Sequence, residues 1–149
     1  MKRFDKRQIN KIIIHCSDTE DDGNKNDFRA IKRYHIEVNK WQDIGYHYVI
    51  EKDFNVIGFA IGNYVIKQGR PEEEIGAHCR GQNKDSIGIC LVGKYDKKPP
   101  TEEALETIRL LVSRIRAGLQ RNIPIYFHRD FDGGKTCPGI KFPIEIKNY

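Results

Sequence analysis

Two histidines stand where an apolar run of the chain ends, and a cysteine follows the second of them on a loop. His15 follows the isoleucines at 12–14, His128 closes the run at 123–127, and Cys137 follows His128 with eight residues between them. Two imidazoles and one thiolate can hold a zinc ion and leave its fourth position open for water or substrate, as catalytic zinc sites do. The pattern therefore predicts a zinc hydrolase whose site joins the two ends of the chain.

Tyr46 and Lys135 carry groups that would complete such a site. A thiolate ligand makes zinc a weaker Lewis acid than neutral ligands would, so an added cation would help to stabilise the oxyanion of amide hydrolysis. Lys135 stands two residues before Cys137 and is tethered to the same loop. Tyr46 would orient the water, or donate a hydrogen bond to the oxyanion or the leaving nitrogen. The structural alternatives are a solvated lysine and a half-buried strand tyrosine.

The three remaining histidines have different surroundings. His35 falls on the apolar face of an expected helix, which favours a hydrogen-bonded core side chain. His47 alternates with Tyr46 along an expected strand, so only one of the two points toward a site on a given face. His78 is flanked by Gly76 and polar residues, and both a structural role and a place in a cleft remain open for it.

Strand-like and helix-like runs alternate along the chain, which predicts an α/β fold with helices packed on a sheet. One helix is expected after Asp27 and another after Thr101, because both residues are good N-caps. Functional sites in such sheets gather at the carboxyl ends of strands, where His15 and His128 both fall. The expected strands cover residues 11–15, 46–51, 86–92 and 123–127, and a weaker hairpin is expected at about 55–66.

The composition is that of an ordinary globular domain, and residues 1–149 are treated as one domain. The net charge of +5 fits simple solubility or attraction to a polyanion such as the cell wall. The basic residues are scattered rather than clustered with aromatics, which argues against nucleic-acid binding. No run approaches the ~20 apolar residues of a membrane span, and the start does not have the pattern of a signal peptide. We expect synthesis in the cytoplasm and no membrane partner.

The four cysteines are expected to be reduced thiols, because the chain is neither short nor dense in cysteine. Cys90 lies in an apolar run and is expected to be a small buried side chain. Cys16 and Cys79 each follow a histidine, and neighbours in a strand point to opposite faces. If those histidines face a cleft, both cysteines should point inward.

Several segments together resemble the type-2 N-acetylmuramoyl-L-alanine amidases, a zinc family that includes short phage lysozymes and the peptidoglycan recognition proteins. The matching segments occur in the family's order and span nearly the whole chain, so their combination is far more specific than any one of them. They are residues 13–17, 43–50, 75–83, 86–93, 128–130 and 135–139.

This resemblance implies a fold, a reaction and a set of functional residues. The fold is a mixed central sheet flanked by helices. The reaction cuts the amide between the lactyl group of N-acetylmuramic acid and the L-alanine of the peptidoglycan stem peptide. The size resembles a phage endolysin, which implies a monomer that acts on the wall after another protein permeabilises the membrane. The implied residues are the zinc ligands His15, His128 and Cys137, the catalytic residues Tyr46 and Lys135, and the groove residues His78 and Asn83.

The chain departs from the family's pattern after the strand at 46–51. The usual short Asp-Gly turn is replaced by residues 53–55, and the stretch 58–68 is several residues longer than usual. This extension puts the substrate preference in doubt, because it would reshape one wall of the groove. The metal set is intact, which counts against a recognition protein without catalytic activity.

Two other functions are compatible with parts of the sequence. A cysteine peptidase acting on the wall would use Cys137 as nucleophile and His128 as base, but it leaves His15 and Lys135 without a role. A binding module would hold peptidoglycan or dock on another protein. Some short phage lysozymes of the family also restrain a phage RNA polymerase, and the basic segment 1–7 neither supports nor excludes that second role.

Overall fold

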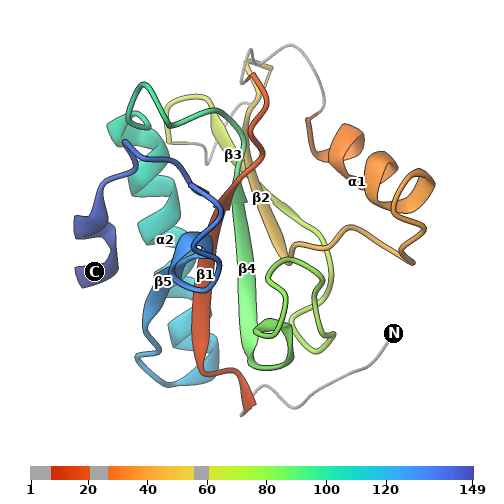
Figure 1. Ribbon diagram of the computed structural model, residues 1–149. Coiled ribbons are helices and arrows are strands. Elements are labelled where there is room, and N and C mark those ends of the chain that lie inside the picture. The colour runs from red at the N-terminus through yellow and green to blue at the C-terminus, as the bar shows by residue number, and fades with distance from the viewer. Residues whose placement is uncertain (1–7, 21–26, 56–60) are drawn as a thin grey trace.

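A five-stranded sheet forms the centre of the computed structural model, which describes residues 8–20, 27–55 and 61–149. The strand order is β3-β2-β4-β1-β5 (Figure 1). β1 is parallel to both β4 and β5, β2 is parallel to β4, and β3 is antiparallel to β2. The sheet is therefore mixed, as the resemblance implied. The strands are β1 (Lys11–Cys16), β2 (Tyr48–Lys52), β3 (Tyr64–Gln68), β4 (Ser86–Leu91) and β5 (Ile125–Phe127).

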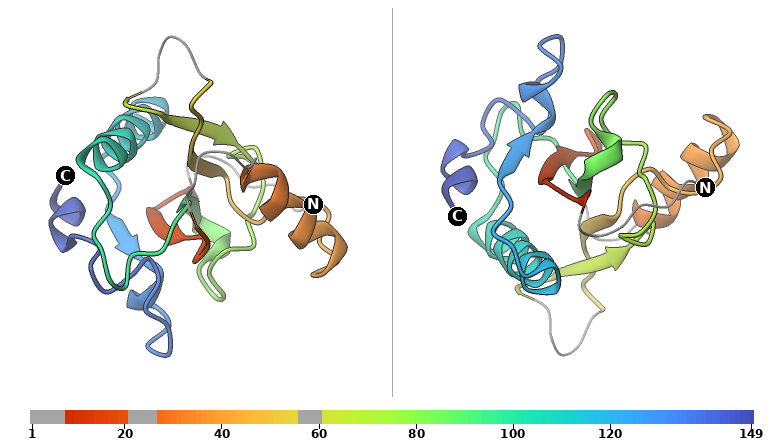
Figure 2. Two further views of the ribbon diagram at one scale, coloured as in Figure 1. Left: turned by 90° about the horizontal axis from the view of Figure 1, so that it is seen from above. Right: turned by 90° about the horizontal axis from the view of Figure 1, so that it is seen from below.

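The two α-helices of the described residues lie on opposite faces of this sheet (Figure 2). Helix α2 (Glu102–Leu119) packs its apolar stripe on the larger core, together with alternate residues of β1 and β4. Helix α1 (Asp27–Glu37) covers one end of the other face through Phe28 and Ile31, beside a smaller cluster that includes Val49 and Cys90. Every residue of β4 is buried, as expected for a central strand covered on both sides.

The start of α2 follows the capping chemistry that the sequence predicts, and the start of α1 differs from it. The side chain of Thr101 accepts a hydrogen bond from the backbone N–H of Ala104 at 3.2 Å, so Thr101 is the N-cap of α2. Helix α1 includes Asp27 as its first residue rather than beginning after it, and the backbone N–H of Phe28 donates to the Glu51 carboxylate at 2.8 Å. This bond ties the first turn of α1 to strand β2.

Strand boundaries differ most from the expectations at the starts of β2 and β5. Pairing with β4 begins at Tyr48 rather than at residue 46, although the backbone of His47 already bonds to Gly88 and Gly69. β5 begins at Ile125, because Pro124 before it has no N–H and contributes only its carbonyl, to Ile12.

The expected hairpin at 55–66 is displaced along the chain. The strand antiparallel to β2 is β3 at Tyr64–Gln68, so most of the described part of the longer stretch 58–68 forms an edge strand. Residues 56–60 lie outside the described residues, as does the basic segment 1–7 that a polymerase-binding role would be tested on. Among the described residues, no helix has the length and apolar character needed to cross a bilayer.

Candidate active site with a metal-binding cluster

Three side chains bring ligand atoms together at one edge of the sheet. The Nδ1 atoms of His15 and His128 lie 3.2 Å apart, and the Cys137 Sγ lies 3.9 Å from the Nδ1 of His15. All three ligand atoms lie within 4.8 Å of one another. A tetrahedral zinc ion would hold two nitrogens about 3.3 Å apart and a nitrogen and a sulfur about 3.6 Å apart, from its usual bond lengths. The cluster therefore fits a zinc ion at close to its observed spacing.

Two neighbouring parallel strands deliver the two histidines. Ile14 of β1 pairs with Phe127 of β5, so the next residue of each strand, His15 and His128, lies at the same carboxyl edge. His15 is still within β1 and is 1% exposed, whereas His128 opens a short 3₁₀ helix, η3 (His128–Asp130), and is half-buried. The buried strand fixes one ligand rigidly, and the turn after β5 supplies the other.

The protonation of these groups suits a divalent cation. Burial, and after it the neighbouring His128, lowers the pKa of His15 well below its ordinary value. Burial, and after it the charge of Lys135, lowers the pKa of His128. Both imidazoles are therefore neutral near pH 7, which is the form that binds metals. In the absence of a metal, the nearby Cys16 thiol, together with burial, raises the pKa of Cys137, and a bound cation would favour its thiolate, to which the backbone N–H of Cys16 donates at 3.3 Å.

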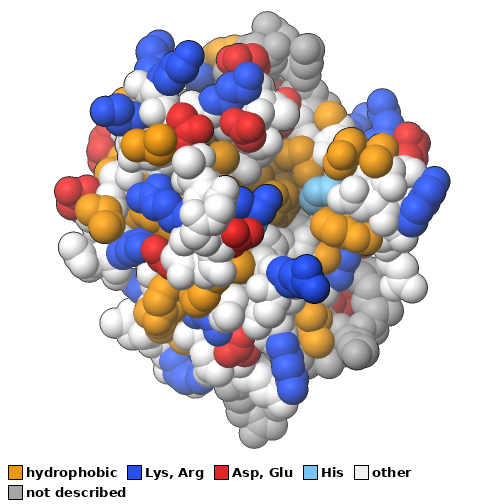
Figure 3. Space-filling model, in the orientation of Figure 1, with side chains coloured by type: hydrophobic (Ala, Val, Ile, Leu, Met, Phe, Trp, Pro, Cys, Tyr) orange, Lys and Arg blue, Asp and Glu red, His pale blue; other side chains and the backbone are white. Residues whose placement is uncertain are grey.

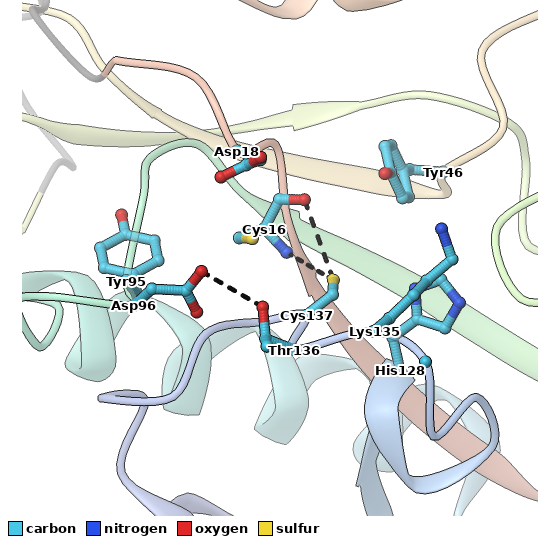
Figure 4. Close-up of a pocket in the computed structure, with 10 residues that line it drawn as sticks. Cys16, Asp18, Tyr46, Tyr95, Asp96, His128, Lys135, Thr136 and Cys137 are labelled. Carbon is cyan, nitrogen blue, oxygen red and sulfur yellow. Dashed lines mark hydrogen bonds between the residues drawn. The ribbon is translucent and has the colours of Figure 1, made fainter.

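An open pocket of about 420 Å³ lies over this cluster. Lys135 and Tyr46 both line it, and the amine of Lys135 extends above His128 toward Tyr46 (Figure 4). Tyr46 packs its ring against His15 with centroids 5.2 Å apart, and burial raises the pKa of its phenol well above the ordinary value. The pocket is lined by Cys16, Asp18, Tyr46, Tyr95, Asp96, His128, Gly134, Lys135, Thr136 and Cys137.

The sequence agrees with a known family over most of its length. The family profile described as N-acetylmuramoyl-L-alanine amidase matches residues 5–140. The chain belongs to this family.

Similar proteins include enzymes and recognition proteins. The endolysin of Escherichia phage T7 is 37% identical over 134 residues, which cover 87% of this chain and 80% of the endolysin. The N-acetylmuramoyl-L-alanine amidase of Mus musculus is 41% identical over 97 residues, or 64% of this chain and 16% of that much longer protein. The crystal structure of peptidoglycan recognition protein-LE in complex with tracheal cytotoxin matches with a TM-score of 0.79 and 26% identity, over 95% of this chain and 81% of that one.

In this amidase, His78 and Asn83 do not line the pocket over the cluster. His78 is 9% exposed and lies beneath His15, with its Nδ1 2.8 Å from the Nε2 of His15. The Asn83 side-chain oxygen accepts hydrogen bonds from the backbone N–H groups of His78 and Cys79, both at 2.9 Å. The structure therefore places the two expected groove residues in the support of a cluster histidine.

The other expectations for histidines and cysteines are met in part. His35 is hydrogen-bonded as expected, because its Nδ1 accepts from the Gly45 N–H at 2.9 Å, but it is half-buried and lines a hollow beside α1 rather than lying in the core. None of the four cysteines, all within the described ranges, is in a disulfide, and Cys79 and Cys90 are buried as expected. Cys16 is different, because it is half-buried against the larger core and also lines the pocket.

Sequence reasoning missed two residues that hold the loop carrying Cys137. The backbone N–H of Arg129 donates to the Cys137 carbonyl at 2.9 Å, and its guanidinium donates to the Gly139 carbonyl at 2.6 Å. On the opposite side, the Asp96 carboxylate accepts from the Ile140 N–H at 3.0 Å. The position of Arg129 next to His128 is a signal for such a role, whereas Asp96 is too far away in the sequence to be connected with this loop.

A second hollow of about 610 Å³ continues from Tyr46 along helix α1. It is more apolar in its lining than the pocket over the cluster, and Ile31 and Tyr34 of α1 form part of its wall. The space-filling view shows apolar side chains in the hollow of this face, with lysine and arginine side chains around it (Figure 3). The two spaces share Tyr46, so a ligand longer than one amide group can extend from the cluster toward α1.

Proposed function

We propose that this chain is a zinc-dependent endolysin that hydrolyses the amide between N-acetylmuramic acid and L-alanine in peptidoglycan. The observation that carries the proposal is the convergence of His15 Nδ1, His128 Nδ1 and Cys137 Sγ under an open pocket. The names of the similar T7 and mouse proteins, an endolysin and an N-acetylmuramoyl-L-alanine amidase, agree with it. Its action belongs at the cell wall, after another protein has permeabilised the membrane.

His15, His128 and Cys137 would hold the metal, which when bound polarises the scissile carbonyl and lowers the pKa of a water molecule. Lys135 is exposed at the pocket wall and brings a positive charge close to the oxyanion that forms from the carbonyl. Because burial raises the pKa of Tyr46, its phenol keeps its proton and donates a hydrogen bond to the oxyanion or to the leaving nitrogen. The two side chains thus act on the same tetrahedral centre from different elements.

The neighbouring hollow along α1 supports a substrate of the size of a muropeptide. The structurally similar recognition protein binds tracheal cytotoxin, which is a monomeric diaminopimelic acid-type peptidoglycan. In this chain the glycan or the stem peptide would occupy the space between Tyr46 and Tyr34 while the amide lies over the cluster. The mixture of apolar wall and surrounding basic side chains suits a ligand that carries both sugar rings and carboxylates.

A cysteine peptidase fits this geometry less well. A peptidase would pair Cys137 with one imidazole, His128, whereas the Cys137 Sγ lies 3.9 Å from the Nδ1 of His15, a residue that a peptidase leaves without a role. His128 also has a lowered pKa and lies against a second imidazole at 3.2 Å. That arrangement favours a shared cation over a thiolate–imidazolium pair.

Digestion of purified peptidoglycan tests the proposal directly. The protein as purified should contain about one zinc per chain, and mass analysis should find released stem peptides with a free L-alanine amine. A chelator should abolish the release and added zinc should restore it. Cys137→Ser should lose zinc and activity together. Full activity after zinc has been removed to below a few per cent would overturn the proposal, as would cleavage at a different bond.

A further inference from the structure

A chain of hydrogen-bonding side chains runs from His15 into the interior. The Nε2 of His15 lies 2.8 Å from the Nδ1 of His78, and the Nε2 of His78 lies 3.2 Å from the Ser86 hydroxyl. The Ser86 hydroxyl donates to the Gln82 carbonyl at 2.6 Å. His15 is 1% exposed, His78 9% and Ser86 0%, so water cannot freely replace the hydrogen bonds between them.

The last acceptor fixes the direction of every bond in the chain. A carbonyl oxygen cannot donate, so the single hydroxyl proton of Ser86 points to Gln82. Ser86 must then accept from the Nε2–H of His78. The His78 ring is 9% exposed, and among the described residues its two nitrogens contact only the Ser86 hydroxyl and the His15 ring, with no carboxylate to hold a second proton. The buried ring is therefore neutral and its Nδ1 is an acceptor. His15 must donate its Nε2–H to that acceptor, which leaves a lone pair on its Nδ1 facing the cluster.

We propose that His78 is a positioning residue that, with Ser86 and the Gln82 carbonyl, holds His15 in the one tautomer able to bind metal through Nδ1. The inference rests on the proposed function, because it concerns the same metal site. It goes beyond that function by giving a buried residue a defined task, whereas the sequence left His78 between a structural place and a place in the groove. Outer hydrogen bonds of this kind typically change metal affinity by about 10–100-fold.

The surrounding backbone is shaped to hold the His78 ring. A Cβ added to Gly88 would lie 2.5 Å from the Cγ of His78, so only glycine leaves room for the ring on strand β4. The side-chain oxygen of Asn83 accepts from the backbone N–H groups of His78 and Cys79 and thereby fixes the backbone from which the His78 ring projects. Beside it, His47 has its own partners, since it donates to the Glu74 carbonyl and accepts from the Gly88 N–H. His47 therefore does not compete for the nitrogens of His78.

The tautomers can be measured without reference to activity. Long-range ¹H–¹⁵N spectra of the full chain, metal-free and zinc-loaded at pH 7, distinguish a protonated Nδ1 from a protonated Nε2. We expect His15 and His78 to carry their proton on Nε2 in both forms. A proton on Nδ1 of either residue in the metal-free protein would overturn the proposal, even if zinc binding itself were normal.

Two substitutions of nearly equal shape separate the hydrogen bond from packing. His78→Asn keeps an acceptor near the position of Nδ1, whereas His78→Leu has a similar shape but no acceptor. Zinc affinity, measured by competition with a chromophoric chelator, should fall about 10–100-fold in His78→Leu and stay within about threefold of the parent in His78→Asn. Equal affinities in the two variants, whether normal or weak, would contradict the proposal.

The proposed function and this inference fail in different ways. A parent protein that neither binds zinc nor releases stem peptides would refute the function, and the tautomers in the metal-free protein would still decide the inference. A parent protein that binds zinc and cleaves the wall, with His78→Leu showing the same zinc affinity, would refute the inference alone. Thermal unfolding of each metal-free variant, compared with the parent, identifies a general loss of folding.

Discussion

Replacing Arg129 by alanine measures how much the loop around Cys137 depends on one side chain. The guanidinium donates to the Gly139 carbonyl at 2.6 Å in a half-buried position and to the Thr136 carbonyl at a weaker 3.3 Å. It also lies over the ring of Phe127 at 4.8 Å from the centroid. A hydrogen bond from a charged donor contributes about 1.5–3 kcal/mol, and the longer, exposed bond adds little. We therefore expect Arg129→Ala to remove about 2 kcal/mol of the free energy that holds the loop in place.

Most of this cost should appear in metal affinity, because the Arg129 contacts lie on both sides of Cys137 and restrict where its sulfur points. A loss of about 2 kcal/mol corresponds to a roughly 30-fold weaker zinc affinity. Competition titration with a chromophoric chelator measures that ratio. Arg129→Lys keeps the charge over Phe127 but not the planar pair of donors. Its zinc affinity should therefore lie between those of the parent and Arg129→Ala. Zinc affinity in Arg129→Ala equal to that of the parent would refute the reasoning, since the loop would then be held by its other contacts.

Three further predictions concern pH, charge and backbone shape. Burial lowers the pKa of His47 to about 4 from an ordinary 6.5, so the unfolded chain takes up the proton first and stability falls as the pH drops below 6.5. Between pH 7 and pH 5 this histidine alone should cost the metal-free protein about 2 kcal/mol, and urea unfolding should show a shallower pH dependence in His47→Gln. Lys135→Met should lower kcat by about 100-fold and leave zinc affinity unchanged in the chelator titration, whereas an equal loss of both would assign it to metal binding. Gly139 has φ +131° and a Cβ there would lie 2.5 Å from the backbone of Tyr95, so Gly139→Ala should lower the melting temperature, and an unaltered value would show that the loop adapts.

The strands and their ends could be predicted because their signals are local, and the family resemblance supplied the grouping of His15, His128 and Cys137. Apolar runs that end at His15 and His128 predict two strand ends, and parallel strands place such ends at one edge of a sheet. The N-cap at Thr101 is likewise readable from a short segment. In contrast, the contact between His15 and His78 joins residues 63 positions apart, and only the folded structure brings them together. The resemblance therefore led to an expectation of groove lining at His78, where the structure has a buried hydrogen bond.

The two faces of strand β4 have different tasks: one packs in the core and the other supports the histidines of the cluster. Ile87, Ile89 and Leu91 belong to the larger core under α2, so the intervening residues Ser86 and Gly88 face the side of the buried histidines. One of them ends the hydrogen-bond chain from His15, and the other leaves space for the His78 ring. A shift of one residue in the pairing of β4 would turn the isoleucines toward the histidines and remove both features at once. The alternation of β4 therefore both buries the core and positions the groups that would keep the proton of His15 on Nε2.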